Sequence, residues 1–180
     1  MKAAMVDIET MSTSDDAAVI AIGTVIFDRD EILAAQSLLI DPITTPGHRS
    51  VDTLEWWNRQ APEVRERMFS GTTPPSSACL DWVQFLEDHE AQDLWANAPT
   101  FDITILRSLF RNCGLRKFPI HHRKERDFRT LTSLARDLGI EYKEAYRNCI
   151  KHDAVSDATA QARAVQIILN TIHRSVLFPA

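Results

Sequence analysis

Four acidic residues and one histidine are the side chains in this sequence whose types and order could do chemistry. They occur along the chain as Asp7, Glu9, Asp102, His152 and Asp157. Carboxylate oxygens are the ligands that Mg²⁺ and similar cations prefer, and such cations can hold and polarise a phosphodiester. A neutral imidazole can take a proton from an attacking water near neutral pH. The set therefore predicts a metal-dependent nuclease.

Asp7 and Glu9 end a short apolar run, residues 3–6, that is typical of a buried first strand. Side chains two residues apart on a strand lie on the same face, so both carboxylates are expected to point into one space. Open α/β sheets bind their ligands at the carboxyl ends of strands, which is where this pair lies. The alternative is a charged strand end that faces water.

Asp102 is expected in the first turn of a helix that follows a second strand, residues 93–97, with Thr100 as the N-cap. An acid in the first turn also stabilises a helix through its dipole, so position alone leaves a catalytic and a structural role open. Asn97 and Phe101 flank this turn and are candidate contacts to nucleic acid. Core packing is the alternative for Phe101.

His152 and Asp157 lie near the start of the last helix. Their spacing would let His152 approach a metal site that Asp157 helps to build. A surface or helix-capping role for His152, or for the neighbouring Asp153, is the alternative. Taken together, carboxylates that crowd at one sheet edge repel one another, and their pKa values rise unless a cation lies among them. We therefore expect a cation in this site.

Longer stretches around these residues extend the pattern over nearly the whole chain. In order, they are DIETM, DDAAVIAIG, TLEWWNRQAPE, WANAPTFDITIL, ERDFRTL and KHDAVSDA. Their sequence and order resemble the DnaQ-like 3′–5′ exonucleases of the DEDDh type, which have an RNase H-like core. Within that superfamily, the chain is most similar to the phage and prophage exonucleases of the exonuclease A (DexA) type.

The resemblance implies a set of roles. Two divalent metal ions, Mg²⁺ or Mn²⁺, would be bound by the four acids, Asp7, Glu9, Asp102 and Asp157. His152 would be the general base. The sister subtype uses a tyrosine one residue nearer the last acid, but Asp153 occupies that position here, so the histidine subtype fits better.

The resemblance also implies a substrate. The enzyme would hydrolyse single-stranded nucleic acid from its 3′ end and release 5′-mononucleotides, with DNA as the expected polymer and RNA as the alternative. The backbone at Thr10 and Met11 would approach the terminal nucleotide. Many relatives have D-x-E-T-T-G where this chain has Met11 and Ser12 after Thr10, a departure that affects the substrate geometry rather than the metal ligands. A homodimer is possible by resemblance only, and a catalytically idle binding subunit is a further alternative.

The distribution of charge favours a nucleic-acid partner. The chain has a net charge of −5, but the segment 107–129 contains eight basic residues against only Glu125 and Asp127. Basic side chains that contact phosphates provide affinity that does not depend on sequence, and Arg126 and Arg129, which lie within the quoted stretch ERDFRTL, are the candidates. A solvated face of charged helices is the alternative.

Length and patterning predict one α/β domain over residues 1–180. The chain is 44% hydrophobic, enough for a substantial core. Strands are expected at 2–9, 18–27 and 32–40, the last two as an antiparallel hairpin, and 93–97 would add a parallel strand. With the resemblance, the expected fold is an RNase H-like mixed sheet flanked by helices.

Helices are expected at 76–88, after Thr100, at 130–138 and at the end of the chain, with short helical stretches around Trp56 and Trp57. Adjacent residues on a helix point in different directions, so core packing is favoured over base stacking for the two tryptophans. A short segment near 118–120 is the remaining candidate element.

The cysteines and the apolar runs indicate the compartment. Cys79, Cys113 and Cys149 are scattered and show no metal-type spacing, which is typical of a reduced, cytoplasmic protein. The first apolar run is broken at Asp7, so no signal peptide is expected, and no run is long enough to span a membrane.

Overall fold

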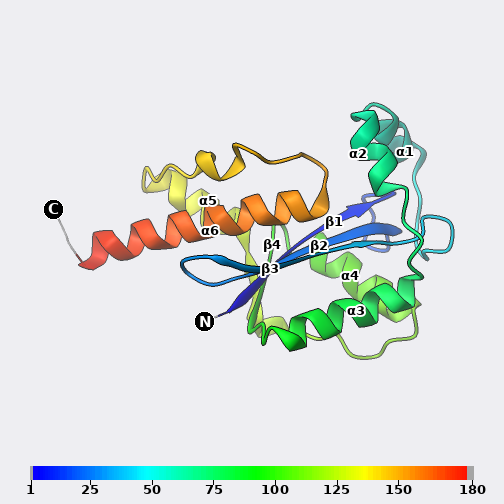
Figure 1. The fold of residues 1–180 in the computed structure, drawn as a ribbon, viewed down its shortest axis with the longest axis horizontal. Helices are drawn as coiled ribbons and strands as arrows, with labels where there is room; N and C mark the ends of the chain where they lie inside the picture. The colour runs from blue at the N-terminus through cyan, green and yellow to red at the C-terminus, as the bar shows by residue number, and fades with distance from the viewer. Residues whose placement is uncertain (1, 178–180) are drawn as a thin grey trace.

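Five strands form one mixed sheet in the computed structural model, which describes residues 2–177 (Figure 1). The strand order is β3-β2-β1-β4-β5. The β1–β2 and β2–β3 pairs are antiparallel, whereas β1–β4 and β4–β5 are parallel. The strands are β1 Ala3–Thr10, β2 Val19–Phe27, β3 Ile32–Leu39, β4 Asp93–Ala96 and β5 Glu125–Asp127. The predicted mixed sheet, with its antiparallel hairpin and parallel strands, is confirmed.

The described residues also form six α-helices around the sheet. They are α1 Val51–Asn58, α2 Pro62–Met68, α3 Pro75–Asp88, α4 Asp102–Asn112, α5 Phe128–Asp137 and α6 Ala154–Leu177. Two short 3₁₀ helices, η1 at His122–Lys124 and η2 at Lys143–Tyr146, complete the elements. Figure 1 shows α5 and α6 on one face of the sheet, α3 and α4 on the other, and α1 and α2 together beyond the carboxyl end of β1.

The alternation of side chains along β1 divides the core between the two faces. Val6 and Ile8 belong to the hydrophobic cluster that includes residues of α3 and α4. Met5 belongs to the cluster that includes residues of α6. Because side chains alternate along a strand, Asp7 and Glu9 lie on the same face as Met5 and therefore point toward α6.

Gly23 allows the start of α6 to lie directly on the sheet. It is paired with Asp7 across the β1–β2 ladder. A Cβ atom at this position would lie 2.1 Å from the backbone carbon of Ala154, which no side chain could tolerate. The glycine is therefore required by close backbone approach, and this approach brings the first turn of α6 next to the acidic end of β1.

The starts of two helices, α4 and α5, differ from the sequence predictions. The N-cap position of α4 is Phe101 rather than Thr100, and no side chain caps the helix. The carboxylate of Asp102 itself folds back to accept a hydrogen bond from the backbone N–H of Ala98 at 3.0 Å. Helix α5 begins at Phe128 because Asp127 caps it through the N–H of Thr130.

The short strand β5 was not predicted, and the segment 118–120 that was proposed as an element is neither helix nor strand. β5 consists of the charged residues Glu125, Arg126 and Asp127, all half-buried, so it lacks the apolar alternation by which a strand is recognised. Phe118 instead packs its ring against Trp82 and Phe110 of the core.

Within residues 2–177, no helix combines the length and the apolar content that a membrane-spanning segment needs.

Candidate active site

One cavity of about 400 Å³ collects all five residues that were predicted to do the chemistry. It lies beyond the carboxyl ends of β1 and β4, beside the first turns of α4 and α6. Its lining consists of Asp7, Ile8, Glu9, Asn97, Ala98, Phe101, Asp102, Arg129, His152, Asp157 and Gln161. Three separate regions of the chain are thus brought together at the sheet edge where the sequence analysis expected them.

Asp7 and Glu9 contribute two carboxylates from β1. Desolvation raises the pKa of Asp7 well above its usual value, and the carboxylates of Asp102, Glu9 and Asp157 raise it further. Desolvation, followed by repulsion from Asp157 and Asp102, raises the pKa of Glu9 to about 8. Without a cation, both side chains are therefore biased toward the protonated form near neutral pH.

Asp102 adds a third carboxylate from the first turn of α4 and is only 4% exposed. Desolvation raises its pKa to about 6, while its hydrogen bond from the Ala98 backbone and the nearby charge of Arg129 act in the opposite direction. Asp102 is thus the least perturbed of the three carboxylates with raised pKa values, because donors and a positive charge face it.

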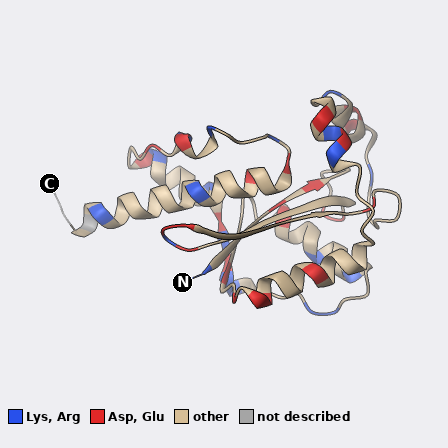
Figure 2. Cartoon of the chain, in the orientation of Figure 1, with Lys and Arg blue, Asp and Glu red and all other residues tan. Residues whose placement is uncertain are grey.

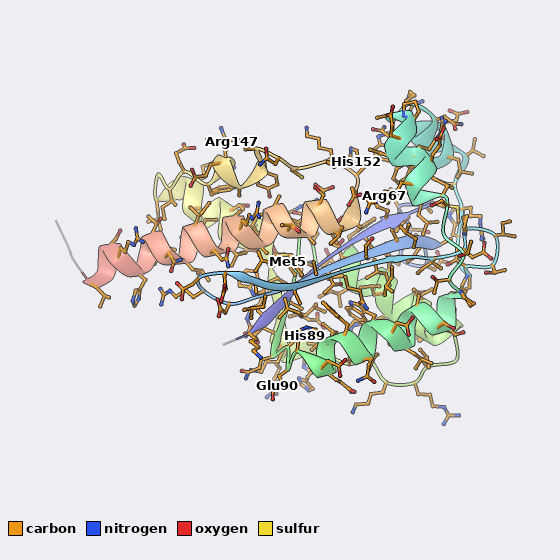
Figure 3. All side chains as sticks on the ribbon, viewed as in Figure 1. Met5, Arg67, His89, Glu90, Arg147 and His152 are labelled. Carbon is orange, nitrogen blue, oxygen red and sulfur yellow. The ribbon has the colours of Figure 1, made fainter. Side chains whose placement is uncertain are left out.

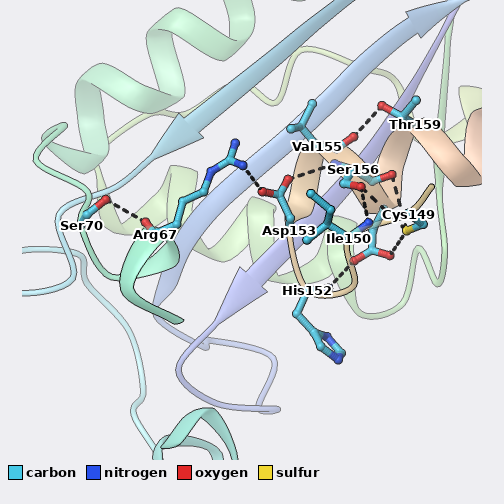
Figure 4. Close-up of polar contacts among 10 residues, drawn as sticks. Arg67, Ser70, Cys149, Ile150, His152, Asp153, Val155, Ser156 and Thr159 are labelled. Atoms are coloured by element: carbon cyan, nitrogen blue, oxygen red, sulfur yellow. Dashed lines mark hydrogen bonds and ion pairs between the residues drawn. The ribbon is translucent and has the colours of Figure 1, made fainter. Parts of the chain in front are cut away.

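His152 and Asp157 are held together by the turn that precedes α6. The backbone N–H of His152 donates to Oδ2 of Asp157 at 2.7 Å, and the thiol of Cys149 lies 3.2 Å from Oδ1 (Figure 4). His152 adopts a left-handed backbone with φ of 64°, which is uncommon for a residue with a side chain. This conformation places the imidazole in the cavity with the carboxylates.

The donor set fits a divalent cation. One side-chain ligand atom each of Glu9, His152 and Asp157 lies within 4.8 Å of the others, so the carboxylates of Glu9 and Asp157 could hold an ion with the imidazole of His152 beside it. Gln161, which is 5% exposed, donates its amide to Oδ1 of Asp7 at 2.8 Å. Its own Oε1 is buried and has no hydrogen-bond partner among the described residues. Crowded carboxylates and an unpaired buried carbonyl oxygen both call for a positively charged or hydrated group between them.

Only some of the residues predicted to contact nucleic acid line the cavity or the hollow next to it. Asn97, Phe101 and Arg129 line the same cavity as the four acids and His152. Thr10 lines a second hollow next to it, whereas Met11 is 3% exposed and packs in a hydrophobic cluster. Arg126 lines neither hollow and instead donates to Asp93.

A groove of about 690 Å³ adjoins the cavity and shares Ile8, Glu9 and Phe101 with it. Its other lining residues are mostly polar: Thr10, Ser12, Thr13, Ser14, His48, Ser50, Asp52, Thr53, Trp56 and Arg59. Ser12 organises part of this wall, because its hydroxyl lies 2.8 Å from Nδ1 of His48. The groove offers hydroxyl and imidazole groups beside a half-buried aromatic ring.

The two tryptophans have different environments, although core packing was expected for both. Trp57 is 1% exposed and donates its indole N–H to the backbone oxygen of Thr10 at 2.9 Å, so the prediction is confirmed for it. Trp56 is half-buried, packs on the same cluster and also lines the groove. Its ring meets the His152 ring edge to face, with centroids 4.7 Å apart.

The basic segment 107–129 is spread over several environments instead of forming one stripe at the cavity. Arg107 forms an ion pair with Glu125, and Arg126 donates to Asp93 at 3.0 Å at the amino end of β4. Figure 2 shows further basic residues on the loop that follows α4 and acidic residues at the carboxyl end of β1. Of the segment's basic residues, Arg129 is the one that lines the cavity.

Comparison with known proteins places the chain in a family. Residues 2–169 match the 3′–5′ exoribonuclease Rv2179c-like domain family. The chain belongs to this family. Membership in the Rv2179c-like family confirms the predicted class, that of the DnaQ-like 3′–5′ exonucleases.

Individual relatives agree with this placement. The chain is 28% identical over 127 residues to the exodeoxyribonuclease of Enterobacteria phage T4, in an alignment that covers 60% of this chain and 55% of the phage protein. The chain therefore spans about half the length of that relative.

Solved structures of low sequence identity share the fold. The nuclease domain of 3′hExo, a DEDDh family member bound to rAMP, has a TM-score of 0.68 and 11% identity, covering 94% of this chain and 92% of that one. A zinc-bound E. coli ExoI–ssDNA complex has a TM-score of 0.66 and 12% identity, covering 96% of this chain and 41% of that one. These likenesses confirm the RNase H-like fold.

Two residues at the site were missed by the sequence analysis. Gln161 lies four residues after Asp157 on the same helix, so it occupies the same face, and this spacing could have identified it. Gly23 lies inside the mostly apolar strand β2, and a glycine in a strand interior is a signal of close backbone approach that could also have been used.

Proposed function

We propose that this cavity hydrolyses phosphodiester bonds at the 3′ ends of single-stranded nucleic acid and releases 5′-mononucleotides. The observation that carries the proposal is the convergence of Asp7, Glu9, Asp102, His152 and Asp157 on one cavity. Membership in a 3′–5′ exonuclease family supports it independently of that geometry.

The four carboxylates are proposed to hold two divalent ions, Mg²⁺ or Mn²⁺. Glu9 and Asp157 lie together with His152 at one side of the site, while Asp7 is surrounded by the other acids. When bound, the ions would supply Lewis-acid stabilisation of the phosphate and leaving oxygens and would make water a stronger acid. Gln161 would keep Asp7 in a fixed orientation through its 2.8 Å hydrogen bond.

His152 is proposed as the general base. An imidazole nitrogen of His152 would accept the proton of the water that attacks the terminal phosphorus. The bond between this phosphorus and the 3′-oxygen of the penultimate nucleotide then breaks, and the oxygen leaves as the new 3′ end. The neighbouring Trp56 ring, 4.7 Å away, restricts the imidazole and keeps part of its surface from water.

The groove beside the cavity is proposed to hold the nucleotides at the 3′ end. It reaches Glu9 and Phe101, so a strand that lies in it would present its last phosphate to the carboxylates. Trp56 offers a partly exposed ring for a base, and such contacts are tolerant of sequence. This arrangement supports single strands as the substrate because a paired base could not use the ring face.

DNA is the first candidate polymer and RNA is the second. The exodeoxyribonuclease of phage T4 supports DNA. The description of the family supports RNA, as do the groove's hydroxyl groups at Ser14 and Thr53, which could hydrogen-bond a ribose 2′-hydroxyl.

The test is hydrolysis of 5′-labelled single-stranded DNA and RNA of one sequence with Mg²⁺, Mn²⁺ or EDTA, in parallel with Asp7→Ala. We expect a ladder that shortens from the 3′ end, requires metal and is absent for Asp7→Ala. The ratio of the two rates selects the polymer. Metal-independent binding of both oligomers without turnover would instead favour the catalytically idle binding subunit.

Residues 1–180 are proposed to act as one exonuclease domain. A homodimer remains a proposal by resemblance, and light scattering after gel filtration distinguishes a mass near 20.4 kDa from twice that value.

A further inference from the structure

Asp153, the residue directly after His152, has a buried carboxylate that lines neither the cavity nor the adjoining groove. Asp153 is 2% exposed, and its Oδ2 lies 2.5 Å from Nη1 of Arg67 on α2 (Figure 4). Arg67 is half-exposed and approaches from outside the sheet, close to the His152 turn (Figure 3). Burying a carboxylate is costly unless it is paired, so this ion pair favours the position that Asp153 occupies.

Asp153 is also fixed from the side of α6. Its Oδ1 accepts a hydrogen bond from the backbone N–H of Ser156 at 3.1 Å, as an N-cap does. Its backbone oxygen accepts from the N–H of Asp157 at 2.9 Å. The carboxylate of Asp153 therefore connects α2 to the first turn of α6, and through that turn to one of the proposed metal ligands.

His152 needs such support because its backbone is in a conformation that residues with a Cβ rarely adopt. With φ of 64°, it lies in the left-handed region, which persists for a non-glycine residue when the surrounding contacts determine it. Two contacts that hold the turn come from the same pair of helices: the Trp56 ring from α1 against the imidazole, and Arg67 from α2 against Asp153.

We propose that Arg67 is a positioning residue of the hydrolytic site, acting through Asp153 on His152. The inference depends on the proposed function, which assigns the general base to His152. Arg67 is absent from the lining of both the cavity and the adjoining groove, so it touches neither the proposed ion sites nor the path of the strand. Its effect on turnover is therefore transmitted by the ion pair to the backbone of the turn.

The first experiment compares Arg67→Ala, Arg67→Lys and the control Arg65→Ala. Arg65 lies two residues before Arg67 on the same helix, and no ion pair joins it to another described residue. On a single-stranded oligomer with Mn²⁺, Arg67→Ala should lower kcat by about 10- to 100-fold, the size that small misplacements of a reacting group produce. KM and the Mn²⁺ affinity from calorimetry should stay near those of the wild type, and Arg67→Lys should recover part of kcat.

The second experiment removes the general base first. In a His152→Ala background, adding Arg67→Ala should cause no further loss, because the group that Arg67 positions is gone. A role of Arg67 in overall folding or in substrate binding would cost the same factor in both backgrounds, and this result would overturn the inference. Asp153→Asn keeps a capping side chain but loses the charge, so it should reproduce the kcat of Arg67→Ala.

A readout without turnover separates this inference from the proposed function. In protein with labelled histidine, the His152 ring resonance is assigned by its loss in His152→Ala. Arg67→Ala should shift or broaden it, whereas Arg65→Ala should not. If wild-type protein is active and neither kcat nor this resonance responds to Arg67→Ala, the positioning role is wrong. If the resonance responds in a protein that hydrolyses nothing, the contact is upheld and the proposed function fails.

Discussion

The side-chain amide of Gln161 donates a 2.8 Å hydrogen bond to Oδ1 of Asp7, joining α6 to β1 across 154 positions of sequence. The remaining carbonyl oxygen of this amide is buried and unpaired among the described residues. The contact fixes one oxygen of the carboxylate that is surrounded by the other three acids. It therefore holds the Asp7 carboxylate in one orientation within the cavity.

Gln161→Leu should weaken the binding of Mn²⁺. The substitution keeps a similar volume but removes the donor that orients Asp7, and loss of such supporting hydrogen bonds typically lowers metal affinity about 10- to 100-fold. Calorimetric titration of Mn²⁺ measures the effect without any substrate. Gln166→Leu is the matched control, because Gln166 lies on the same helix but donates to the backbone of Asp28. Equal affinities for the two variants would remove Gln161 from the site.

His152→Ala should lower kcat by about 10²–10⁴-fold, which is the usual contribution of a general base. Binding of Mn²⁺ should remain largely intact, because the carboxylates stay in place. Single-turnover hydrolysis of a labelled oligomer gives the rate. His89→Ala is the control, since His89 ends α3 on the other side of the sheet (Figure 3). A turnover near that of the wild type in His152→Ala would exclude the histidine from the mechanism.

The metal-free protein should lose stability as the pH rises from about 5 to 8. The pKa of Glu9 is raised from 4.5 to about 8 in the folded state, so folding favours its protonated form. The stabilisation that protonated Glu9 contributes is fully present below its pKa in the unfolded chain. It is lost as the pH rises through the pKa of Glu9 in the folded protein. One proton corresponds to a decrease of up to about 1.4 kcal/mol in the free energy of unfolding per pH unit.

Urea denaturation in EDTA at several pH values measures this slope. Glu9→Gln, which cannot ionise at this position, should flatten the slope between pH 5 and 8. Saturating Mg²⁺ should also flatten it, because a cation favours the ionised carboxylates. A metal-free protein that gains stability over this range would contradict the assignment of the raised pKa to burial among like charges.

Much of the sheet could be predicted because its strands carry local signals. β1 begins with the apolar run 3–6 and β2 is mostly apolar, and the acids at the end of β1 lie where open α/β sheets commonly bind ligands. β5 could not be predicted, because its three charged residues are a strand only through pairing with β4. The predicted Thr100 cap of α4 is wrong because the backbone N–H groups of Asp102 and Ile103, which such a cap would use, donate instead to the backbone oxygens of Ala98 and Pro99.

The five acidic and histidine residues of the cavity could be predicted because their order along the chain is informative, but the residues that support them could not. Arg67 meets Asp153 only because α2 folds back over the start of α6, a contact that no spacing in the sequence reveals. Basic residues between 107 and 129 show the opposite problem. Their density predicts a phosphate-binding surface, yet several are paired with acids far from the cavity.

This division of the basic residues gives a test that separates Arg129 from Arg126, both of which the sequence analysis assigned to nucleic acid. Arg129 is exposed, lines the cavity and lies close enough to lower the pKa of Asp102, so it can meet a phosphate that enters the site. Arg126 is held by Asp93 at 3.0 Å and by the backbone oxygens of Arg123 and Glu125. The positive charge of Arg126 is therefore already paired with a carboxylate of the protein.

Arg129→Ala should therefore raise the dissociation constant for a single-stranded oligomer and reduce the slope of log K against log salt by about 0.7, the value for one phosphate contact on a single strand. Arg126→Ala should leave that slope unchanged. Fluorescence anisotropy of a labelled oligomer at several salt concentrations, with Ca²⁺ in place of Mg²⁺ to slow hydrolysis, measures both. If only Arg126→Ala changed the slope, the bound oligomer would instead run past β5. Such a change requires that a phosphate replace Asp93 as the partner of Arg126.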